Sequence, residues 1–182
     1  GAIVINEVLS HSHGVAADWI ELYNTTDSQI DIGGWYLSDG ADDLKKYRIA
    51  AEKAADWLLS VMDEDGCWRK NEYLNHVHTY NARTAWSLLY THKISENVAY
   101  QEAAENNIDW ALTQQLENGW LQNNGFYPYQ EPLVHTIAYS IRGILEAAIY
   151  LRKKKYLEAA VKAATPIMHA QRPNGSLPGS FN

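Results

Sequence analysis

The chain has 182 residues, of which 46% are hydrophobic and 20% are charged, and its formal net charge is −7. This composition is typical of a globular protein, and the acidic balance disfavours a phosphate backbone, so we predict no nucleic-acid partner. No apolar run approaches the roughly 18–20 residues that a membrane span needs, so we predict no membrane partner. The single cysteine, Cys67, argues against a disulfide framework and a multi-cysteine zinc site, and we expect no metal or other cofactor.

Strand signals occupy the part of the chain up to residue 49. Residues 3–9 are rich in β-branched side chains, residues 19–23 alternate apolar with polar or aromatic side chains, and residues 35–37 form a third short run. Clusters of Gly, Asn, Asp and Ser between these runs are typical of turns. Residues 47–49 also have a strand-like pattern, so we place the end of the β segment at residue 49.

Helical periodicity begins at residue 50. Apolar side chains recur at spacings of three and four along residues 51–62, 79–93, 98–116, 135–153 and 156–171. No Pro-, Gly- or Ser-rich linker separates this part from the β segment. We therefore predict an α+β chain with two domains, a β segment over residues 1–49 and helical hairpins over residues 50–182.

The helical part repeats itself. Trp57 precedes Gly66 by nine residues, and Trp110 precedes Gly119 by the same nine, while a weaker third copy ends at Gly175. The repeat predicts a helical hairpin of 53–57 residues, in which Trp57 and Trp110 occupy equivalent buried places. Each glycine suits the left-handed conformation that ends a helix.

A histidine–threonine pair opens a predicted helix in each hairpin. The first pair is His78 and Thr79, and the second is His135 and Thr136. Each threonine suits an N-cap, where its hydroxyl accepts a free backbone N–H. The recurring histidine is either a packing feature of the repeat or, because its pKa lies near neutrality, a general acid or base or a sugar ligand.

Three consecutive blocks of the β segment, residues 5–9, 18–24 and 30–39, resemble the first half of a lamin tail domain. That family has an immunoglobulin-like β-sandwich. The resemblance implies a partial immunoglobulin-like fold for residues 2–49, because the family's later strands have no equivalent after residue 49.

The helical part is similar to another group of proteins. Residues 115–120 resemble the Gln-and-Trp repeat of triterpene cyclases, and residues 78–83, 118–124 and 172–179 look like segments of bacterial toroid proteins associated with saccharides. Residues 51–182 thus resemble part of the α/α-toroid shared by terpenoid cyclases and six-hairpin glycosidases, about five helices where a full ring has about twelve. The resemblance implies a carbohydrate-processing or carbohydrate-binding fragment without full catalytic competence, whose enzymatic status stays open.

The expected ligand is an oligosaccharide, which aromatic faces would stack against and amides would hydrogen bond. Arg83 could bind the carboxylate of an acidic sugar. The competing interpretations are that Arg83 pairs with one of the acids of the chain and that Trp120 clamps neighbouring helices. The predicted binding residues are His78, Arg83, Trp120, Asn123, Asn124, Tyr127 and His135.

Other reactive side chains have simpler explanations. Asp63, Glu64 and Asp65 stand together after a predicted helix, where acidic residues usually form a solvated loop rather than the carboxylate pair of a glycosidase. Cys67 has no base nearby in the sequence and is expected to pack in the interior. No catalytic residue is assigned.

Two further functional hypotheses remain. The chain is alternatively a non-catalytic module whose β segment contacts a protein or a surface, or an artificial recombination of two natural fragments without a selected function. Both incomplete halves would leave apolar faces or strand edges open, so we expect self-association.

Overall fold

The computed structural model describes residues 2–9, 19–32, 41–128 and 130–181. The chain divides into two compact units, Gly1–Asp39 and Gly40–Asn182, and each is described by itself. The predicted run at residues 35–37 lies outside the described residues.

The first unit contains an antiparallel pair of strands, β1 (Ile3–Leu9) and β2 (Trp19–Asn24). Ile3 lies opposite Asn24 and Leu9 opposite Trp19, with a register irregularity between Ile5 and Glu7. The first two predicted strands are therefore confirmed. The described part of this unit holds this two-stranded sheet, so the immunoglobulin-like sandwich stays a prediction.

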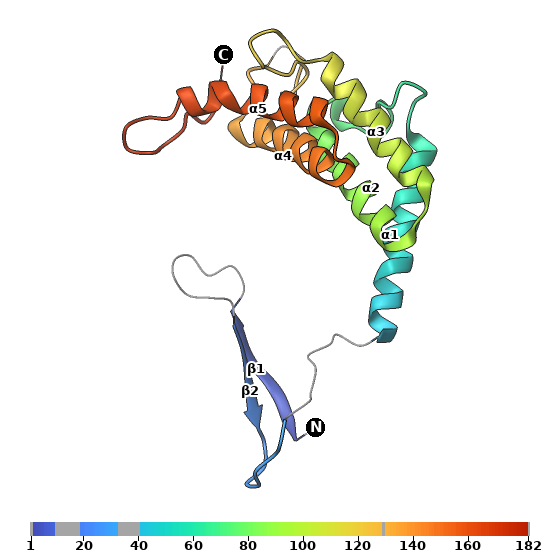
Figure 1. Ribbon diagram of the computed structural model, residues 1–182, viewed down its shortest axis with the longest axis vertical. Coiled ribbons are helices and arrows are strands. Elements are labelled where there is room, and N and C mark those ends of the chain that lie inside the picture. The colour runs from blue at the N-terminus through green and yellow to red at the C-terminus, as the bar shows by residue number, and fades with distance from the viewer. Residues whose placement is uncertain (1, 10–18, 33–40, 129, 182) are drawn as a thin grey trace. The chain divides into compact units, whose positions relative to one another are not determined.

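The second unit is an array of five α-helices (Figure 1). They are α1 (Ala41–Val61), α2 (Ala82–Ser95), α3 (Val98–Thr113), α4 (Val134–Leu151) and α5 (Lys154–His169). Short 3-10 turns, η1 (Tyr73–Asn75) and η2 (Thr79–Asn81), precede α2. All five predicted helices are present. None of the described helices is long and apolar enough to cross a membrane.

Helix α1 begins ten residues before the predicted start, so the strand-like interpretation of residues 47–49 is wrong. No glycine or proline interrupts the sequence from Ala41 to Val61, and Arg48 forms an ion pair with Glu52 one turn later, at 2.8 Å. Three residues that include an aromatic and a β-branched side chain fit either period, and the helical segment on their C-terminal side extends through them.

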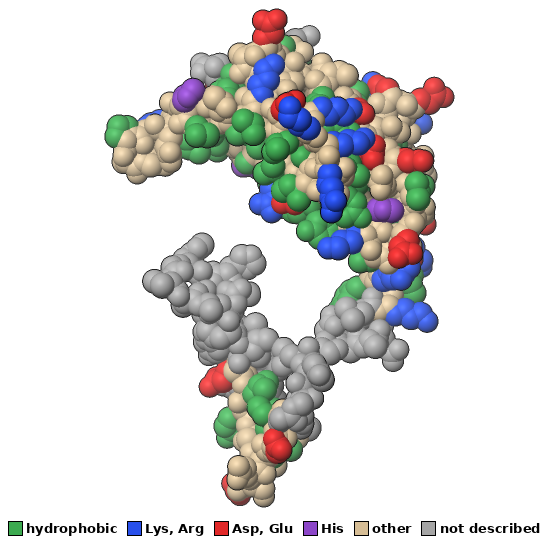
Figure 2. Space-filling model, in the orientation of Figure 1, with side chains coloured by type: hydrophobic (Ala, Val, Ile, Leu, Met, Phe, Trp, Pro, Cys, Tyr) green, Lys and Arg blue, Asp and Glu red, His purple; other side chains and the backbone are tan. Residues whose placement is uncertain are grey.

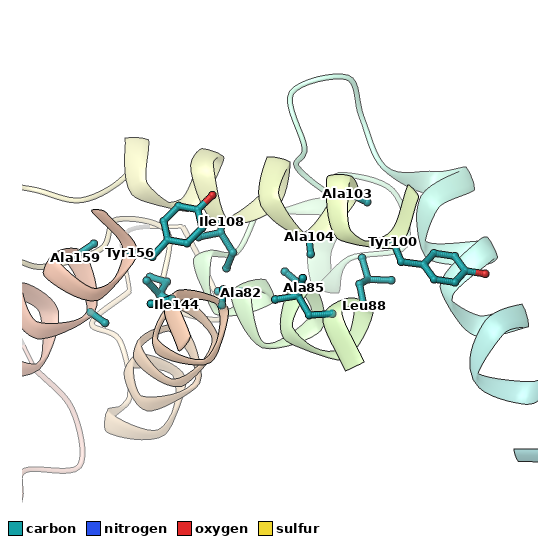
Figure 3. Packing of buried hydrophobic residues seen from close by; sticks show 14 of the residues in the cluster. Ala82, Ala85, Leu88, Tyr100, Ala103, Ala104, Ile108, Ile144, Tyr156 and Ala159 are labelled. Carbon is teal, nitrogen blue, oxygen red and sulfur yellow. The ribbon is translucent and has the colours of Figure 1, made fainter. Parts of the chain in front are cut away.

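Small side chains bring the helices close together in the core. Tyr100, Ala103 and Ala104 of α3 and Tyr156 and Ala159 of α5 are buried (Figure 3). They pack in one cluster with apolar residues of α2 and α4. Helices α2 and α4 approach closely at Gly143 of α4, where an added Cβ would lie 2.2 Å from the backbone of Ala82 in α2.

The repeat predicted from the sequence is present in the backbone as a turn that occurs three times. The glycine has a positive φ in each copy, 83° at Gly66, 96° at Gly119 and 83° at Gly175, as predicted. Its predicted place at the helix end is wrong, because α1, α3 and α5 end at Val61, Thr113 and His169, before each turn. The residue before each glycine accepts a hydrogen bond from the N–H of the residue after it. These bonds are Cys67 N–H to Asp65 Oδ1 at 3.2 Å, Trp120 N–H to Asn118 Oδ1 at 3.1 Å and Ser176 N–H to Asn174 Oδ1 at 3.1 Å.

The two tryptophans that the repeat predicts to be buried are Trp57 and Trp110. Trp57 is 52% exposed, so its predicted burial is wrong, and Trp110 is half-buried. Trp68, by contrast, is 2% exposed and donates from Nε1 to the Leu58 carbonyl at 2.9 Å. Backbone bridges pair Met62 with Trp68 and Gln115 with Leu121, so the equivalent of Trp68 is Leu121. A side chain on a helix is buried only where a neighbouring element packs against it, and about half of the Trp57 side chain lies exposed among the described residues.

The predicted threonine N-caps are also wrong. Thr79 lies in η2, where its hydroxyl donates to the Gln122 carbonyl at 3.0 Å, and the N-cap of α2 is Asn81. Thr136 lies inside α4, where its hydroxyl donates to the carbonyl of the N-cap Leu133 at 2.9 Å. The two hydroxyls bind carbonyl groups instead of the free N–H groups of a helix start.

Candidate functional site

Six rings gather where the segment before α2 and the loop before α4 meet the first turns of those helices. η1 and η2 contribute two tyrosines, the loop contributes a phenylalanine and a tyrosine, and α4 contributes a histidine and a tyrosine. We call this group the aromatic cluster; its members are Tyr73, Tyr80, Phe126, Tyr127, His135 and Tyr139.

The rings of the cluster form a continuous series of edge and tilted contacts. The Tyr73 ring centroid lies 5.8 Å from that of Tyr127 and 6.3 Å from that of Phe126. Phe126 lies 6.2 Å from Tyr80 and 5.9 Å from His135. The hydroxyl oxygens of Tyr73 and Tyr127 are 3.1 Å apart, so one donates to the other. Four of these rings, from Tyr73, Tyr80, Phe126 and Tyr127, line a hollow of about 440 Å³.

A cation lies at one end of the aromatic cluster. The guanidinium carbon of Arg83 is 4.1 Å from the centroid of the Tyr139 ring, and the Tyr139 ring is 5.1 Å from that of His135. Arg83 and His135 are both exposed. No ion pair of Arg83 is found among the described residues, in contrast to Arg142, which pairs with Glu146 at 2.6 Å. The Arg83 guanidinium is therefore open to an external anion.

His78 supports the cluster from the interior. Its side chain is fully buried, with Nδ1 3.1 Å from the Gly125 carbonyl, Nε2 3.4 Å from the Tyr73 carbonyl and the ring stacked 4.4 Å from Tyr80. Burial lowers the pKa of His78, so the neutral ring is favoured, and its single N–H donates to one of these two carbonyls, on the loop or on η1. The two repeated histidines thus both contact rings of the aromatic cluster, but His135 is exposed at the surface and His78 is buried.

The two predicted asparagines shape the loop on the side of the cluster. Asn124 is 3% exposed and accepts from the Ser140 hydroxyl at 2.8 Å, which attaches the loop to α4. Asn123 is half-buried, has a φ of 57°, and donates from its amide to Gln114 Oε1 at 2.9 Å. Both amides therefore have protein partners, although both residues line a hollow of about 490 Å³ that also contacts Tyr127.

Trp120 stands apart from the aromatic cluster. Its ring is 5.3 Å from Phe181 and lines a hollow of about 380 Å³ together with Leu116 and Pro132. This hollow shares Gln122, Leu121, Gln130 and Pro132 with the hollow beside Asn123. Of the seven predicted residues, the structure thus brings Arg83, Tyr127 and His135 into the cluster, buries His78 beneath it, and places the others along the adjoining loop.

Glu72 is a residue that the sequence did not single out. Its side chain is half-buried and accepts from the Asn81 amide at 2.8 Å. Burial raises the pKa of Glu72, and its charge contributes, after burial, to raising the pKa of Tyr80 to about 12. A raised pKa makes the protonated form of this carboxyl group more accessible than that of an exposed glutamate. No local pattern marks it, since its burial comes from contacts distant in the sequence.

The acidic residues 63–65 and Cys67 have the structural roles expected of them, in a loop and in the interior. Arg69 forms ion pairs with Asp63 at 3.0 Å and with Asp65 at 2.7 Å. The hydrogen bond from Arg69 lowers the pKa of Asp65, so this carboxylate stays ionised and is unsuited to donate a proton. Cys67 is 1% exposed, and burial raises the pKa of its thiol to about 12, which disfavours a nucleophilic thiolate.

Metal chemistry has no evident site in this part of the chain. Among the described residues, no group of three or more His, Cys, Asp or Glu side chains is arranged to hold a metal ion. The site is therefore defined by aromatic rings, a free guanidinium and hydrogen-bonding groups.

Two solved structures share the fold of 76% of this chain. One is a variant of UGL with the saccharide dGlcA-Glc-Rha-Glc, with a TM-score of 0.64 and 16% identity. The other is an unsaturated glucuronyl hydrolase from Bacillus sp. GL1, responsible for glycosaminoglycan degradation, with a TM-score of 0.62 and 15% identity. This chain covers 43% of the length of each. Both are α/α-toroids, so the predicted toroid fold of the helical part is confirmed.

The family comparison concerns the other end of the chain. No curated protein matches the chain in sequence. The Lamin Tail Domain model matches residues 1–111, a longer stretch than residues 2–49, and it includes both strands, α1, α2 and most of α3. Since this match covers more than half of the 182 residues, the chain belongs to the lamin tail domain family.

Proposed function

We propose that the helical unit binds an oligosaccharide on the aromatic cluster. The observation that carries the proposal is the continuous row of rings from Tyr127 to Tyr139, with Arg83 at its end. The flat apolar face of a sugar ring packs against an aromatic side chain, whose burial is favourable in water. The fold shared with saccharide-degrading enzymes supports the same class of ligand.

An acidic sugar fits this site better than a neutral one. Arg83 presents several N–H donors in a fixed planar arrangement, which matches the two oxygens of a carboxylate. The Tyr139 ring lies against the guanidinium and holds it at the surface. A local cation also offsets the repulsion that a net charge of −7 imposes on an acidic ligand.

Binding, rather than complete glycosidase activity, is the function that we propose. Glycoside hydrolysis uses two carboxyl groups on either side of the scissile bond. Glu72 provides one candidate with a raised pKa, whereas Asp63 and Asp65 are held by Arg69. The chain also covers 43% of the length of the enzymes whose fold it shares.

The test is a titration of the chain with a uronate oligosaccharide and a neutral one, followed by NMR. We expect shifts in the rings of the aromatic cluster, and we expect Arg83→Gln to weaken uronate binding about tenfold while neutral sugar binding is unchanged, because a charged hydrogen bond is worth about 1.5–3 kcal/mol. The matched control is Arg142→Gln, which removes another exposed arginine that lies over an aromatic ring.

The titration also separates the alternatives. Shifts confined to residues of β1 and β2 would replace the saccharide proposal with a β-segment binding module. An absence of shifts with either sugar at millimolar concentration would reject the proposal and favour an artificial recombination of two fragments.

A further inference from the structure

A repeated contact joins the turns after α1 and α3 to helices α3 and α5, respectively. Gly66, in the turn after α1, lies on the backbone of Asn106 in α3, where an added Cβ would be 2.5 Å from the Asn106 carbonyl. Gly119, in the turn after α3, lies on the backbone of Lys162 in α5, where an added Cβ would be 2.2 Å from the Lys162 carbonyl oxygen. The absence of a side chain at these two glycines is therefore what permits neighbouring hairpins to approach.

Side chains add specific bonds to this contact. Gln115 donates from its amide to the Gly119 carbonyl at 3.2 Å within its own turn and to the Ala159 carbonyl of α5 at 2.9 Å. At the previous repeat, the Tyr100 hydroxyl of α3 donates to Asp56 of α1 at 2.7 Å. Helices α3 and α5 thus receive the preceding turn through their backbone, and Tyr100 adds a bond from α3 to α1 itself.

The turn after α5 has the same form but receives nothing. Gln171 donates to the Gly175 carbonyl at 3.0 Å, as Gln115 does to Gly119, and Asn174 makes the same bond as Asn118. Within the described part of the chain, no atom lies within 4 Å of a Cβ built on Gly175. The loop that carries it extends away from the helices in Figure 1.

The other end of the array carries the matching receptor surface. Residues 47–55 of α1 are identical to residues 156–164 of α5 at six of nine positions, in the pattern Tyr-x-x-Ala-Ala-x-Lys-Ala-Ala. Tyr156 of α5 is 0% exposed and Tyr100 of α3 is 2% exposed, but the equivalent Tyr47 is 60% exposed. Helix α1 therefore exposes the surface that α3 and α5 use to receive a turn.

We propose that two copies of this chain associate head to tail, with the turn at Gly175 of one copy seated on α1 of the next. The equivalences assign the contacts: Gly175 lies on the backbone of Lys53, the Gln171 amide donates to the Ala50 carbonyl, and Tyr47 becomes buried against α5. The receiving helix already has the sequence that accepts Gly119 within one chain, which is why a second copy, rather than an unrelated partner, is the occupant.

This contact differs from the general covering of apolar surface. Hydrophobic side chains are also exposed over α4 and α5, among Lys and Arg side chains (Figure 2). An association through that face alone would be symmetric and would close at a dimer. A head-to-tail contact joins two different surfaces, so each added copy leaves one receptor and one turn open, and growth continues unless a ring closes.

The experiment measures the mass of the 182-residue chain by sedimentation equilibrium. We expect the average mass to rise from that of the 20.6 kDa monomer as the concentration increases to about 1 mM, since a small interface is weak. Ala50→Glu adds a charged side chain to the exposed receptor surface of α1, so we expect it to lower the association constant at least tenfold. The control is Ile49→Glu, at a position whose equivalents Glu102 and Glu158 are exposed glutamates.

A second variant blocks the opposite end. Gly175→Asn preserves the left-handed turn, which asparagine tolerates, but adds a side chain that would collide with the backbone of Lys53. Each variant keeps only one of the two complementary surfaces, so neither the Ala50→Glu chain nor the Gly175→Asn chain should associate alone. When the two are mixed, the intact turn of the Ala50→Glu chain meets the intact receptor of the Gly175→Asn chain, and a dimer should form.

Three results would overturn the proposal. One is a monomer at every concentration. A second is an equal loss of association in Ile49→Glu and Ala50→Glu, when circular dichroism shows that both variants are folded. The third is either a mixture of the two variants that stays monomeric, which would show that the turn and α1 do not meet, or single variants that associate like the parent, which would show a contact elsewhere.

Discussion

The hairpin of α1 and α2 and the hairpin of α3 and α4 repeat the same turn but give equivalent side chains different surroundings. Gly66 and Gly119 both have positive φ, and they lie on the backbone of α3 and α5, respectively. His78 is fully buried under Tyr80, whereas His135 is exposed at the end of the aromatic cluster. The backbone of the repeat is thus copied, while the candidate binding surface comes from positions where the two copies differ.

This difference shows why recurrence alone is a weak guide to function. A turn copies well because its glycine and its Asn or Asp act on backbone atoms within a few residues. The surroundings of a histidine depend on which loop covers it, and the loop containing Gly125 covers His78. Four pairs of measurements test this separation between backbone and surroundings.

The largest effect is expected within the first hairpin. Trp68→Ala should cost about 3–5 kcal/mol, because a buried ring and a hydrogen bond to the Leu58 carbonyl are both lost. Trp57→Ala should cost less than about 1 kcal/mol, since the Trp57 side chain is half exposed. Urea unfolding of both variants measures the difference. Equal costs would mean that Trp57 is covered.

The second comparison places one substitution in two copies of the turn. Gly119→Ala should cost about 3 kcal/mol or more, because the added Cβ meets the Lys162 carbonyl and the φ of 96° strains any other residue. Gly175→Ala retains only the strain, about 1 kcal/mol. The unfolding free energies should be determined at low concentration, where chains do not associate. Similar values would show that the Gly119 contact has little energetic importance.

The third comparison concerns the buried histidine and pH. The folded chain disfavours protonation of His78, and of His76, so the unfolded chain binds more protons below the ordinary pKa of 6.5. Stability should therefore fall as the pH decreases below about 6.5. In His78→Gln, which retains an amide donor for the Gly125 carbonyl, the fall should be smaller. Melting temperatures between about pH 5 and 8, the range in which His titrates, give the result. An unchanged slope in the variant would contradict the burial of this ring.

The smallest effect concerns Glu72. Its raised pKa means that the folded chain holds a proton that the unfolded chain has lost, so this residue reduces stability as the pH rises above its ordinary pKa of 4.5. Glu72→Gln keeps an oxygen for the Asn81 amide and removes the charge. We expect the variant to melt above the parent at neutral pH, and the two to melt at similar temperatures near the ordinary glutamate pKa of 4.5. A variant that melts below the parent at neutral pH would show that the bond to Asn81 depends on the charge.

The predicted helices were confirmed because their signal is local. Five stretches of three-to-four spacing became α1 to α5, and three glycines adopted the predicted positive φ. The start of α1 was wrong, since residues 47–49 fit both periods and only the rest of the helix decides between them. The lamin tail resemblance was confirmed over a longer stretch than predicted, residues 1–111.

The candidate site was predicted less completely. Sequence spacing placed Arg83, Tyr127 and His135 near one end of the array, and they do meet in the cluster. It missed Glu72 and four members of the cluster, Tyr73, Tyr80, Phe126 and Tyr139. Tyr139 follows His135 by four residues, so a helical projection of α4 would have found it, but Tyr73 and Glu72 come near the site only through η1 and η2.

By itself, the sequence determined the elements whose cause lies within a few residues: the helical periods, the positive φ of the repeat glycines and the first two strands. Tertiary structure decided which members of the repeat are covered. It buried Trp68 and not Trp57, His78 and not His135, and it seated Gly66 and Gly119 while leaving Gly175 open. The physical reason is that periodicity fixes the direction of a side chain along its own helix, whereas burial, pKa and contact depend on the neighbouring element, which the local pattern does not contain.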